Sequence, residues 1–287
     1  MVSNKIFISA GDLSGELHAS SLVKEIKLID SLCHISGIGG NNLKSVVDEF
    51  IADIVDLSAF GFFPINQFFH LKRVLNKLKV YLIKNHPNKV ILVDYYGFHI
   101  HVARFAKKLD IPVYYYISPQ VWASRSCRIK ELAKTVKKML VILPFEEKLY
   151  KDNNVDAIFV GNPLLDKIPE KKSFATSTPH NIGLFPGSRK NVIRRHMPII
   201  LKTAQLLKEK INAKFIIFMV DNSIKFNLPK YIKFEKSNNF EKRKLLDFAI
   251  CPSGTVSLEN ALMGIPMVVM YKLSYFNYFF IKAIIKV

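Results

Sequence analysis

Two segments in the second half of the chain combine glycine, hydroxyl and charged side chains that could bind an anion. In LFPGSRKNVIRRH (184–196), an apolar run ends at Gly187 and Ser188, and Arg189 follows where the chain turns back into a helix. Amides at a helix N-terminus and an arginine fork suit a negatively charged group. A basic surface turn would have the same residues. Pro198 fits best in a first helical turn, so we expect the helix to begin later than this motif suggests.

The second segment is CPSGTVSLENALMGIPMVV (251–269), in which Ser253, Gly254 and Thr255 form another strand-to-helix turn rich in donors. Glu259 lies one helical turn beyond Thr255 and on the same face. Amides in such turns can bind a diphosphate, and a carboxylate at this distance can bridge ribose hydroxyls. The two turns together favour a nucleotide site more than either motif does alone.

A carboxylate stands at the end of an expected strand in VDYYGFHIH (93–101). Asp94 could take a proton from a hydroxyl nucleophile if burial raises its pKa sufficiently. A helix cap or a turn aspartate is the simpler alternative. His99 and His101 share a face if the segment is extended, but no third ligand is nearby, so we expect no metal site and no cofactor.

Two further turns in the first half have the composition of ligand loops. In GDLSGE (11–16), glycines flank Ser14 and could expose amides at a helix start, although any first strand-to-helix turn favours glycine. We assign Ser14 and Gly15 to an acceptor site.

The segment ISPQVWASRSCRIK (117–130) contains Ser118, Trp122 and two arginines. It could present an aromatic wall and guanidiniums to a sugar or a phosphate, and we assign Ser118 and Trp122 to the acceptor site as well. A lone tryptophan could equally be part of the core.

Short apolar runs without alternation precede these turns, as expected for parallel strands covered on both faces. Their repetition with amphipathic helical segments predicts an α/β protein of two Rossmann-like, doubly wound domains that face a cleft. The Pro-rich segment 163–181 predicts a linker between domains 1–165 and 166–287. The expected strands are KIFISAG (5–11), KVILVD (89–94), VYYYIS (113–118), MLVILP (139–144), AIFVGN (157–162), NIGLFPG (181–187), KFIIFMV (214–220), DFAICPS (247–253) and PMVVMY (266–271).

The composition is that of a basic globular protein of 287 residues, with 42 Lys and Arg against 23 Asp and Glu and a net charge of +19. Such a charge suits an anionic partner or surface, although a lysine-rich composition can also follow from genome base content. Three dispersed cysteines indicate a reducing cytoplasm. We expect no signal peptide and no membrane-spanning segment.

One segment, LSAFGFFPINQFFHLKRVLNKLKVYLIK (57–84), places aromatic residues ahead of a basic helix. This pairing is typical of peripheral binding to an anionic membrane, while an ordinary amphipathic core helix is the alternative. The candidate membrane residues are Phe60, Phe62, Phe63, Phe68, Phe69, Lys72 and Arg73, together with Lys77 and Lys79.

Taken together, these segments resemble the lipid-A-disaccharide synthases, which are inverting glycosyltransferases of the GT-B type. The matching pieces run in family order over essentially the whole chain: SAGDLSGELHAS, GIGG, VDYYGFH, YISPQVWASR, ILPFEEKLY, FVGNPLLD, LFPGSR and PSGTVSLENALMGIPMVVMYKLS.

The resemblance implies condensation of UDP-2,3-diacylglucosamine with 2,3-diacylglucosamine 1-phosphate, which yields the lipid A disaccharide and UDP. Asp94 matches the family's essential aspartate and is the implied base, and Arg189 matches its essential arginine. Residues implied to bind UDP are Gly187, Ser188, Arg189, Ser253, Gly254, Thr255 and Glu259.

The sequence departs from the family pattern in several places. Asp12 and Glu16 stand where the family usually has Glu and Asp, His99 replaces an asparagine, and Val192 replaces a glutamate. The chain also stops at IIKV, before the family's Ser-Leu-Pro-Asn segment. We therefore expect an incomplete second domain and a chain that is poorly active or insoluble when expressed alone.

Other functions stay open. Another UDP-N-acetylglucosamine-dependent GT-B enzyme, or an inactive fragment that binds only UDP or membrane, would share much of this pattern. The scattered cations carry no nucleic-acid-binding motif, so we expect no nucleic acid as partner. The expected partners are the UDP-sugar, the acylated glucosamine phosphate and an anionic membrane surface, with a possible homodimer. The expected location is cytoplasmic, peripheral on the inner membrane.

Overall fold

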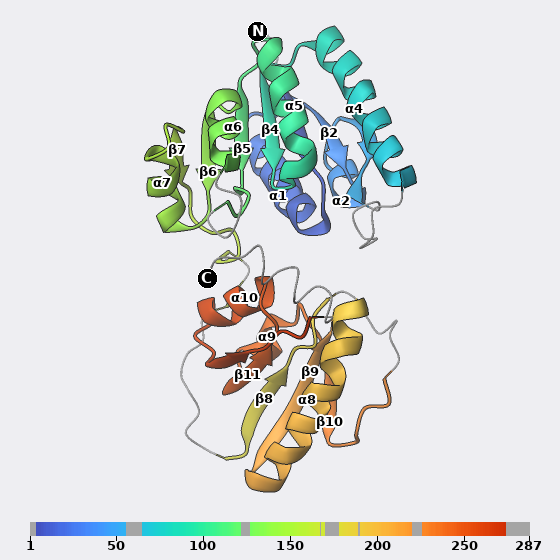
Figure 1. Ribbon diagram of the computed structural model, residues 1–287, viewed down its shortest axis with the longest axis vertical. Helices are drawn as coiled ribbons and strands as arrows, with labels where there is room; N and C mark the ends of the chain where they lie inside the picture. The colour runs from blue at the N-terminus through green and yellow to red at the C-terminus, as the bar shows by residue number, and fades with distance from the viewer. Residues whose placement is uncertain are drawn as a thin grey trace. The chain divides into compact units, whose positions relative to one another are not determined.

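The computed structural model describes residues 4–55, 65–121, 127–166, 168–169, 178–188, 190–219 and 226–273, with backbone only at 65–67. The chain divides into two compact units, Met1–Pro163 and Leu164–Val287 (Figure 1). The division falls at the start of the Pro-rich segment 163–181.

The first unit is built on a seven-stranded parallel sheet with the order β3-β2-β1-β4-β5-β6-β7. The order reverses between β1 and β4, which is the arrangement of a Rossmann-like sheet. The strands are β1 (Lys5–Ala10), β2 (His34–Gly39), β3 (Glu49–Asp53), β4 (Lys89–Val93), β5 (Val113–Tyr116), β6 (Lys138–Val141) and β7 (Ala157–Phe159).

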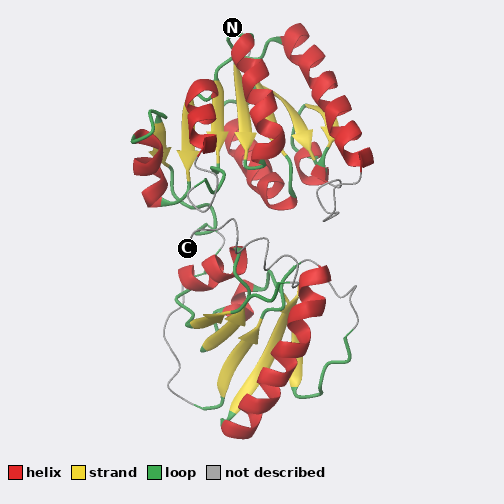
Figure 2. Cartoon of the chain, viewed as in Figure 1, coloured by secondary structure: helices red, strands yellow, loops and turns green. Residues whose placement is uncertain are grey.

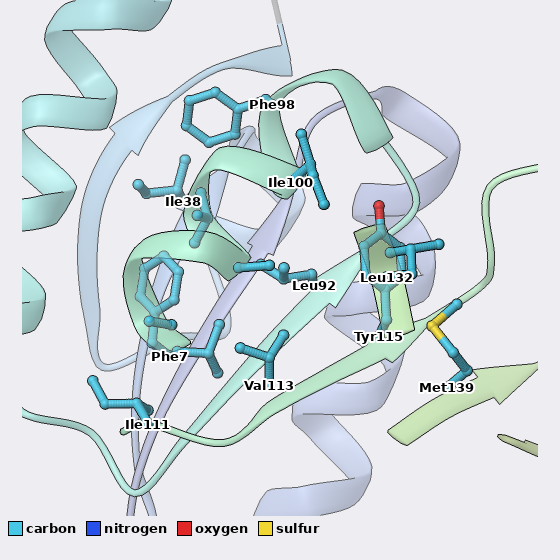
Figure 3. Packing of buried hydrophobic residues seen from close by; sticks show 14 of the residues in the cluster. Phe7, Ile38, Leu92, Phe98, Ile100, Ile111, Val113, Tyr115, Leu132 and Met139 are labelled. Atoms are coloured by element: carbon cyan, nitrogen blue, oxygen red, sulfur yellow. The ribbon is translucent and has the colours of Figure 1, made fainter. Parts of the chain in front are cut away.

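Helices cover both faces of this sheet, because successive side chains of each central strand enter opposite cores. Phe7 of β1 and Leu92 of β4 pack in one core, part of which Figure 3 shows. Ile8 and Val93 pack in the other core. The helices are α1 (Leu13–Ile29), α2 (Asn41–Lys44), α4 (Ile65–Asn85), α5 (Tyr96–Lys108), α6 (Cys127–Thr135) and α7 (Pro144–Lys151).

The second unit repeats this plan in a five-stranded parallel sheet with the order β10-β9-β8-β11-β12 (Figure 2). Its order reverses between β8 and β11. The strands are β8 (His180–Leu184), β9 (Ala213–Met219), β10 (Ile232–Lys236), β11 (Phe248–Cys251) and β12 (Met267–Val269), and the helices are α8 (Lys190–Lys210), α9 (Phe240–Arg243) and α10 (Thr255–Leu262).

All nine expected strands are present, and β2, β3 and β10 were missed. The expectation for Pro198 was wrong: α8 begins at Lys190 and continues through Pro198 to Lys210. A proline inside a helix costs about 3 kcal/mol because it removes one backbone hydrogen bond. Apolar side chains buried on both sides of Pro198, among them Met197 and Ile200, offset this cost.

Candidate active site

The polar turns of the first unit lie where its strand order reverses. Ala10 pairs with Val93 at the carboxyl ends of β1 and β4, so Gly11 and Asp94 follow a pair of neighbouring residues. Ligands of such sheets bind at this point, just beyond the ends of the strands. The sheet topology therefore brings GDLSGE and Asp94 together, although they are far apart in the sequence.

Asp94 is half-buried and adopts a left-handed backbone conformation with φ of 52°. Its amide donates to the Tyr116 carbonyl of β5 at 3.1 Å. Burial, followed by the negative charge of Asp12, raises the pKa of the Asp94 carboxyl to about 6. A carboxylate with this pKa is a stronger base than an ordinary aspartate and is still ionised at neutral pH.

The first motif forms the N-terminus of α1 beside this carboxylate. Asp12 caps the helix, with Oδ1 accepting from the Gly15 amide at 2.7 Å. Gly15 is buried, and a Cβ there would lie 3.8 Å from the Asp94 Cβ. Ser14 is exposed on the first turn of the helix. Ser14 and Gly15 therefore lie, like Asp94, at the switch point of the sheet, which is the place beyond β1 and β4 where the strand order reverses.

Glu16 connects this turn to α2, a role that was not predicted from the sequence. It is 1% exposed, and its Oε1 accepts from the Leu43 amide of α2 at 3.0 Å. A Cβ at Gly40 would lie 2.8 Å from its Oε2. Glu16 therefore ties α1 to the turn after β2. Burial of an unpaired carboxylate is costly, so a buried acid needs hydrogen-bond partners. Had the helix face that carries Glu16 been predicted as buried, this residue could have been expected to make such bonds.

Ser118 follows β5 but is 6% exposed, and its hydroxyl donates to Glu146 Oε1 at 2.5 Å. Glu146 also accepts from the Leu143 amide at the start of α7, so this bond fixes the end of β5 to α7. Trp122, the other residue assigned to this loop, lies outside the described residues.

In the second unit, the two anion-binding candidates also meet where the strand order reverses. Leu184 of β8 pairs with Ile250 of β11, and the PGSR and PSGT turns follow these strands. Gly187 has φ of 112°, which favours glycine, and a Cβ there would lie 3.8 Å from Pro252 Cγ. Ser188 is exposed beside it, and Arg189 lies outside the described residues.

Ser253, Gly254 and Thr255 are exposed at the start of α10. The first amides of a helix have no partner within the helix, so this turn can donate to an anion. Glu259 lies one turn further along α10, and its side chain is 17% exposed. Each half of the predicted UDP site is thus at a strand end of the same switch point.

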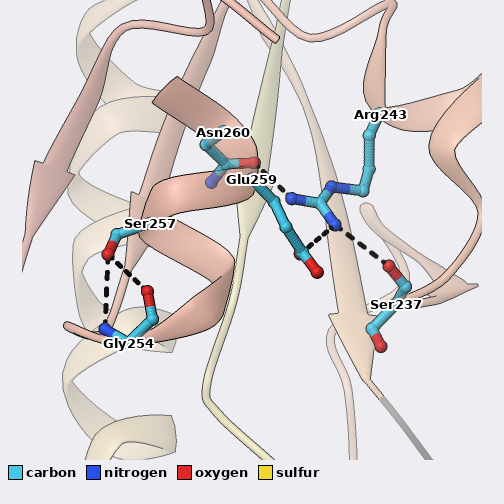
Figure 4. A network of polar contacts seen from close by, with 6 residues as sticks. All are labelled: Ser237, Arg243, Gly254, Ser257, Glu259 and Asn260. Carbon is cyan, nitrogen blue, oxygen red and sulfur yellow. Dashed lines mark hydrogen bonds and ion pairs between the residues drawn. The ribbon is translucent and has the colours of Figure 1, made fainter. Parts of the chain in front are cut away.

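Arg243 binds two residues of α10, Glu259 and Asn260, from the side of the helix, as Figure 4 shows. It is 1% exposed and donates to Glu259 Oε2 and Asn260 Oδ1, each at 2.7 Å. Its guanidinium also lies over the rings of Phe185 and Phe240. The sequence did not predict this role of Arg243, because nothing near this residue in the sequence indicates that its partners are on another helix.

The segment predicted to contact a membrane is described only in part, because Phe60, Phe62 and Phe63 lie outside the described residues. Phe68 and Phe69, on the first turns of α4, are 64% and 59% exposed. Lys72 and Arg73 are exposed next to them. Lys77 donates to the Ile51 carbonyl at 2.6 Å, so it is engaged within the first unit.

Neither a candidate membrane span nor a candidate metal site is present among the described residues. In that part of the chain, no helix combines the length and apolar character needed to cross a bilayer. The same residues contain no group of three or more histidines, cysteines and acids placed to hold a metal ion.

Solved structures show the fold class of the chain. A putative UDP-N-acetylglucosamine 2-epimerase of Listeria monocytogenes has a TM-score of 0.66 and 11% identity, covering 95% of this chain and 80% of that one. MurG of Acinetobacter baumannii has a TM-score of 0.55 and 12% identity, covering 98% and 90%. The fold is that of the GT-B enzymes, with two Rossmann-like units.

Sequence comparison gives the family. The family described as lipid-A-disaccharide synthetase matches residues 6–287. A lipid-A-disaccharide synthase of Syntrophus aciditrophicus is 36% identical, covering 100% of this chain and 80% of the relative. Lipid-A-disaccharide synthase 1 of Legionella pneumophila is also 36% identical, covering 99% and 79%. The chain belongs to the lipid-A-disaccharide synthetase family, and it is a glycosyltransferase of lipid A biosynthesis.

Proposed function

We propose that the chain condenses UDP-2,3-diacylglucosamine with 2,3-diacylglucosamine 1-phosphate, forming the β-1,6-linked disaccharide 1-phosphate and UDP. The main support for this proposal is that each unit has candidate site residues at its switch point. The first unit has Asp94, a carboxylate with a raised pKa, and the second unit has two donor-rich turns. Two solved structures with this fold support a UDP-sugar donor: MnaA of S. aureus is in complex with UDP, and the UDP-GlcNAc 2-epimerase of Neisseria meningitidis is bound to UDP-GlcNAc.

In the proposed reaction, the Asp94 carboxylate takes the proton of the acceptor 6-hydroxyl. The acceptor oxygen then forms a bond to the anomeric carbon of the donor sugar, while the bond from that carbon to the UDP oxygen breaks. Attack opposite to the leaving group inverts the configuration. The proton ends on Asp94, and negative charge grows on the departing diphosphate.

We assign compensation of that charge to the second unit. The amides of Ser188, Ser253 and Thr255, the last at the N-terminus of α10, are the assigned donors, and Arg189 supplies a positive charge. The Gly254 amide instead donates to the Ser257 hydroxyl at 3.3 Å. Glu259 is assigned to the ribose hydroxyls. Its ion pair with Arg243 uses Oε2, which leaves Oε1 for a second donor.

The test is UDP release from matched donors, one diacylated and one not acylated. We expect release only with the diacylated donor and acceptor, and its loss in Asp94→Asn. Asp152→Asn, the same change at an exposed carboxylate, is the control. Efficient use of the non-acylated donor would indicate a different GT-B activity. Binding of UDP without turnover in the unmodified chain would indicate an inactive fragment.

We also propose that the start of α4 binds an anionic membrane, where the acylated substrates reside. Its support is the exposure of Phe68 and Phe69 beside Lys72 and Arg73. Reversal of charge in Lys72→Glu/Arg73→Glu should reduce sedimentation with anionic vesicles. Lys107→Glu/Lys108→Glu, at the exposed end of α5, is the matched control. Equal sedimentation of both double variants would contradict the proposal.

A further inference from the structure

The backbone carbonyl of Asp94 accepts two hydrogen bonds from buried side chains. His99 Nδ1 lies 2.7 Å from this oxygen, and the Tyr115 hydroxyl donates to it at 2.5 Å. Both side chains are 0% exposed. His99 comes from α5 and Tyr115 from β5, so two separate elements hold the peptide that carries the candidate base.

The protonation state of His99 follows from its partners. A carbonyl only accepts, so Nδ1 must carry the proton, and Nε2 is then free to accept from the Ser9 hydroxyl at 2.9 Å. Burial lowers the pKa of His99 to about 4, which keeps the ring neutral. The chain of bonds from Ser9 through His99 to Asp94 therefore joins β1 to the end of β4.

The held peptide has an unusual conformation. Asp94 and Tyr95 both have positive φ, 52° and 47°, which residues other than glycine rarely adopt. Such conformations persist only where the surroundings enforce them. The Tyr95 ring also packs against Gly11, where a Cβ would lie 1.9 Å from Tyr95 Cδ1. The turn is thus fixed by its backbone bonds and by its packing.

We propose that His99 is a positioning residue, which, with Tyr115, holds the Asp94 turn in its left-handed conformation and so keeps the carboxylate at the switch point. This proposal rests on the function of Asp94 proposed above. The groups that face the turn are Asp12 from α1, Tyr115 from β5 and the Tyr95 ring. Of these groups only Tyr115 donates to the Asp94 carbonyl, and it does so in addition to His99, so none of them replaces the His99 donor.

The experiment compares His99→Phe with His99→Asn. Phenylalanine keeps an aromatic ring in the pocket and removes both hydrogen bonds. Asparagine places its amide donor near the position of Nδ1, so it retains the bond to the Asp94 carbonyl and loses the bond to Ser9. We expect kcat for UDP release to fall about a hundredfold in His99→Phe, with KM for the donor unchanged, and to be largely retained in His99→Asn.

Two measurements do not depend on turnover. The Asp94 carboxyl is titrated by carbon NMR in each variant, and thermal unfolding checks that each one is folded. In His99→Phe, we expect the carboxyl to become more solvated and its pKa to fall toward the ordinary value of 3.8, while His99→Asn resembles the parent. An unchanged Asp94 titration in a folded His99→Phe variant would overturn the positioning role, whatever its activity.

The two proposals can fail separately. If the unmodified chain releases no UDP but the Asp94 titration moves in His99→Phe, the assigned reaction fails and the structural role of His99 stands. If the chain is active and His99→Phe is as active as the parent, the positioning role fails and the assigned reaction stands. Tyr115→Phe, which removes the second donor to the same carbonyl, should shift the titration in the same direction as His99→Phe.

Discussion

Arg243 Nη1 lies 2.7 Å from Glu259 Oε2 in the interior of the second unit, where the arginine side chain is 1% exposed. Arg104 Nε lies equally close to Glu131 Oε1, at 2.6 Å, but that arginine side chain is 48% exposed. The two pairs share their chemistry and differ in burial. Removal of a partner from a buried pair leaves a charge without compensation, whereas an exposed charge is solvated by water.

Arg243→Leu should therefore lower the free energy of unfolding by about 3–5 kcal/mol. Arg104→Leu should lower it by less than about 1 kcal/mol. Urea denaturation of both variants checks the comparison. Because Arg243 also orients Glu259, UDP should bind more weakly to Arg243→Leu even where the variant is folded. Similar losses of stability in the two variants would show that burial does not determine the strength of these pairs.

The activity should depend on the ionisation of Asp94. With a pKa of about 6, the carboxyl proposed as the base is ionised above pH 6, so kcat/KM should rise up to that pH and then level off. Asp12→Asn removes the negative charge that raises this pKa, and asparagine still caps α1. The acid limb of the profile should then move to lower pH. A profile that stays in place would exclude Asp12 as a cause.

Asp94→Asn should be more stable than the parent at neutral pH, although we expect it to be inactive. The folded-state pKa of about 6 lies above the ordinary 3.8, so the folded protein binds the proton more tightly. The resulting cost to stability is absent below pH 4, develops between pH 4 and 6, and is complete above pH 6. The gain at pH 8 is up to roughly 3 kcal/mol. Denaturation at pH 4 and pH 8 measures it, with Asp152→Asn as the control that should show no such difference.

Two glycine substitutions should have opposite effects on stability. Gly187→Ala places a side chain at φ of 112° and within 3.0 Å of Val192, so it should cost about 1–3 kcal/mol and weaken UDP binding at the PGSR turn. Gly97 lies near the start of α5 with nothing within 4 Å of an added Cβ. Gly97→Ala should stabilise the protein by about 0.5–1 kcal/mol. Destabilisation by both substitutions would contradict the conformational argument.

The strands that the sequence did not predict lack a long apolar run. β3 and β10 are edge strands: Glu49–Asp53 begins and ends with an acid, and polar residues alternate with apolar ones in Ile232–Lys236. β2 contains Gly37 and Gly39, which lower its apolar content. The predicted strands are mostly central, and their continuous apolar runs reflect burial on both faces. Hydrophobic patterns in the sequence therefore predict the central strands of a sheet more readily than its edge strands.

The residues of the candidate site also differ in how far they could be predicted from the sequence. The positions of Asp94 and of the two donor-rich turns at strand ends could be predicted, because each follows an apolar run, whereas their roles stay predictions. The partners of Glu16, His99 and Arg243 could not be predicted, because they belong to other elements of the fold. For His99 the decisive partners are the Asp94 carbonyl and the Ser9 hydroxyl, which is 90 positions away. Only the folded sheet brings such groups together.

The strand order of the second unit has a consequence for how that unit forms. β8 and β11 are neighbours, yet Asn181 and Asp247, which hydrogen-bond across them, are 66 positions apart. Closing so long a loop is slow, because its entropy is lost before the contact is gained. We therefore expect the PGSR and PSGT turns to come together late in folding. A ligand that needs both turns would bind the finished unit alone and, by mass action, protect it from unfolding.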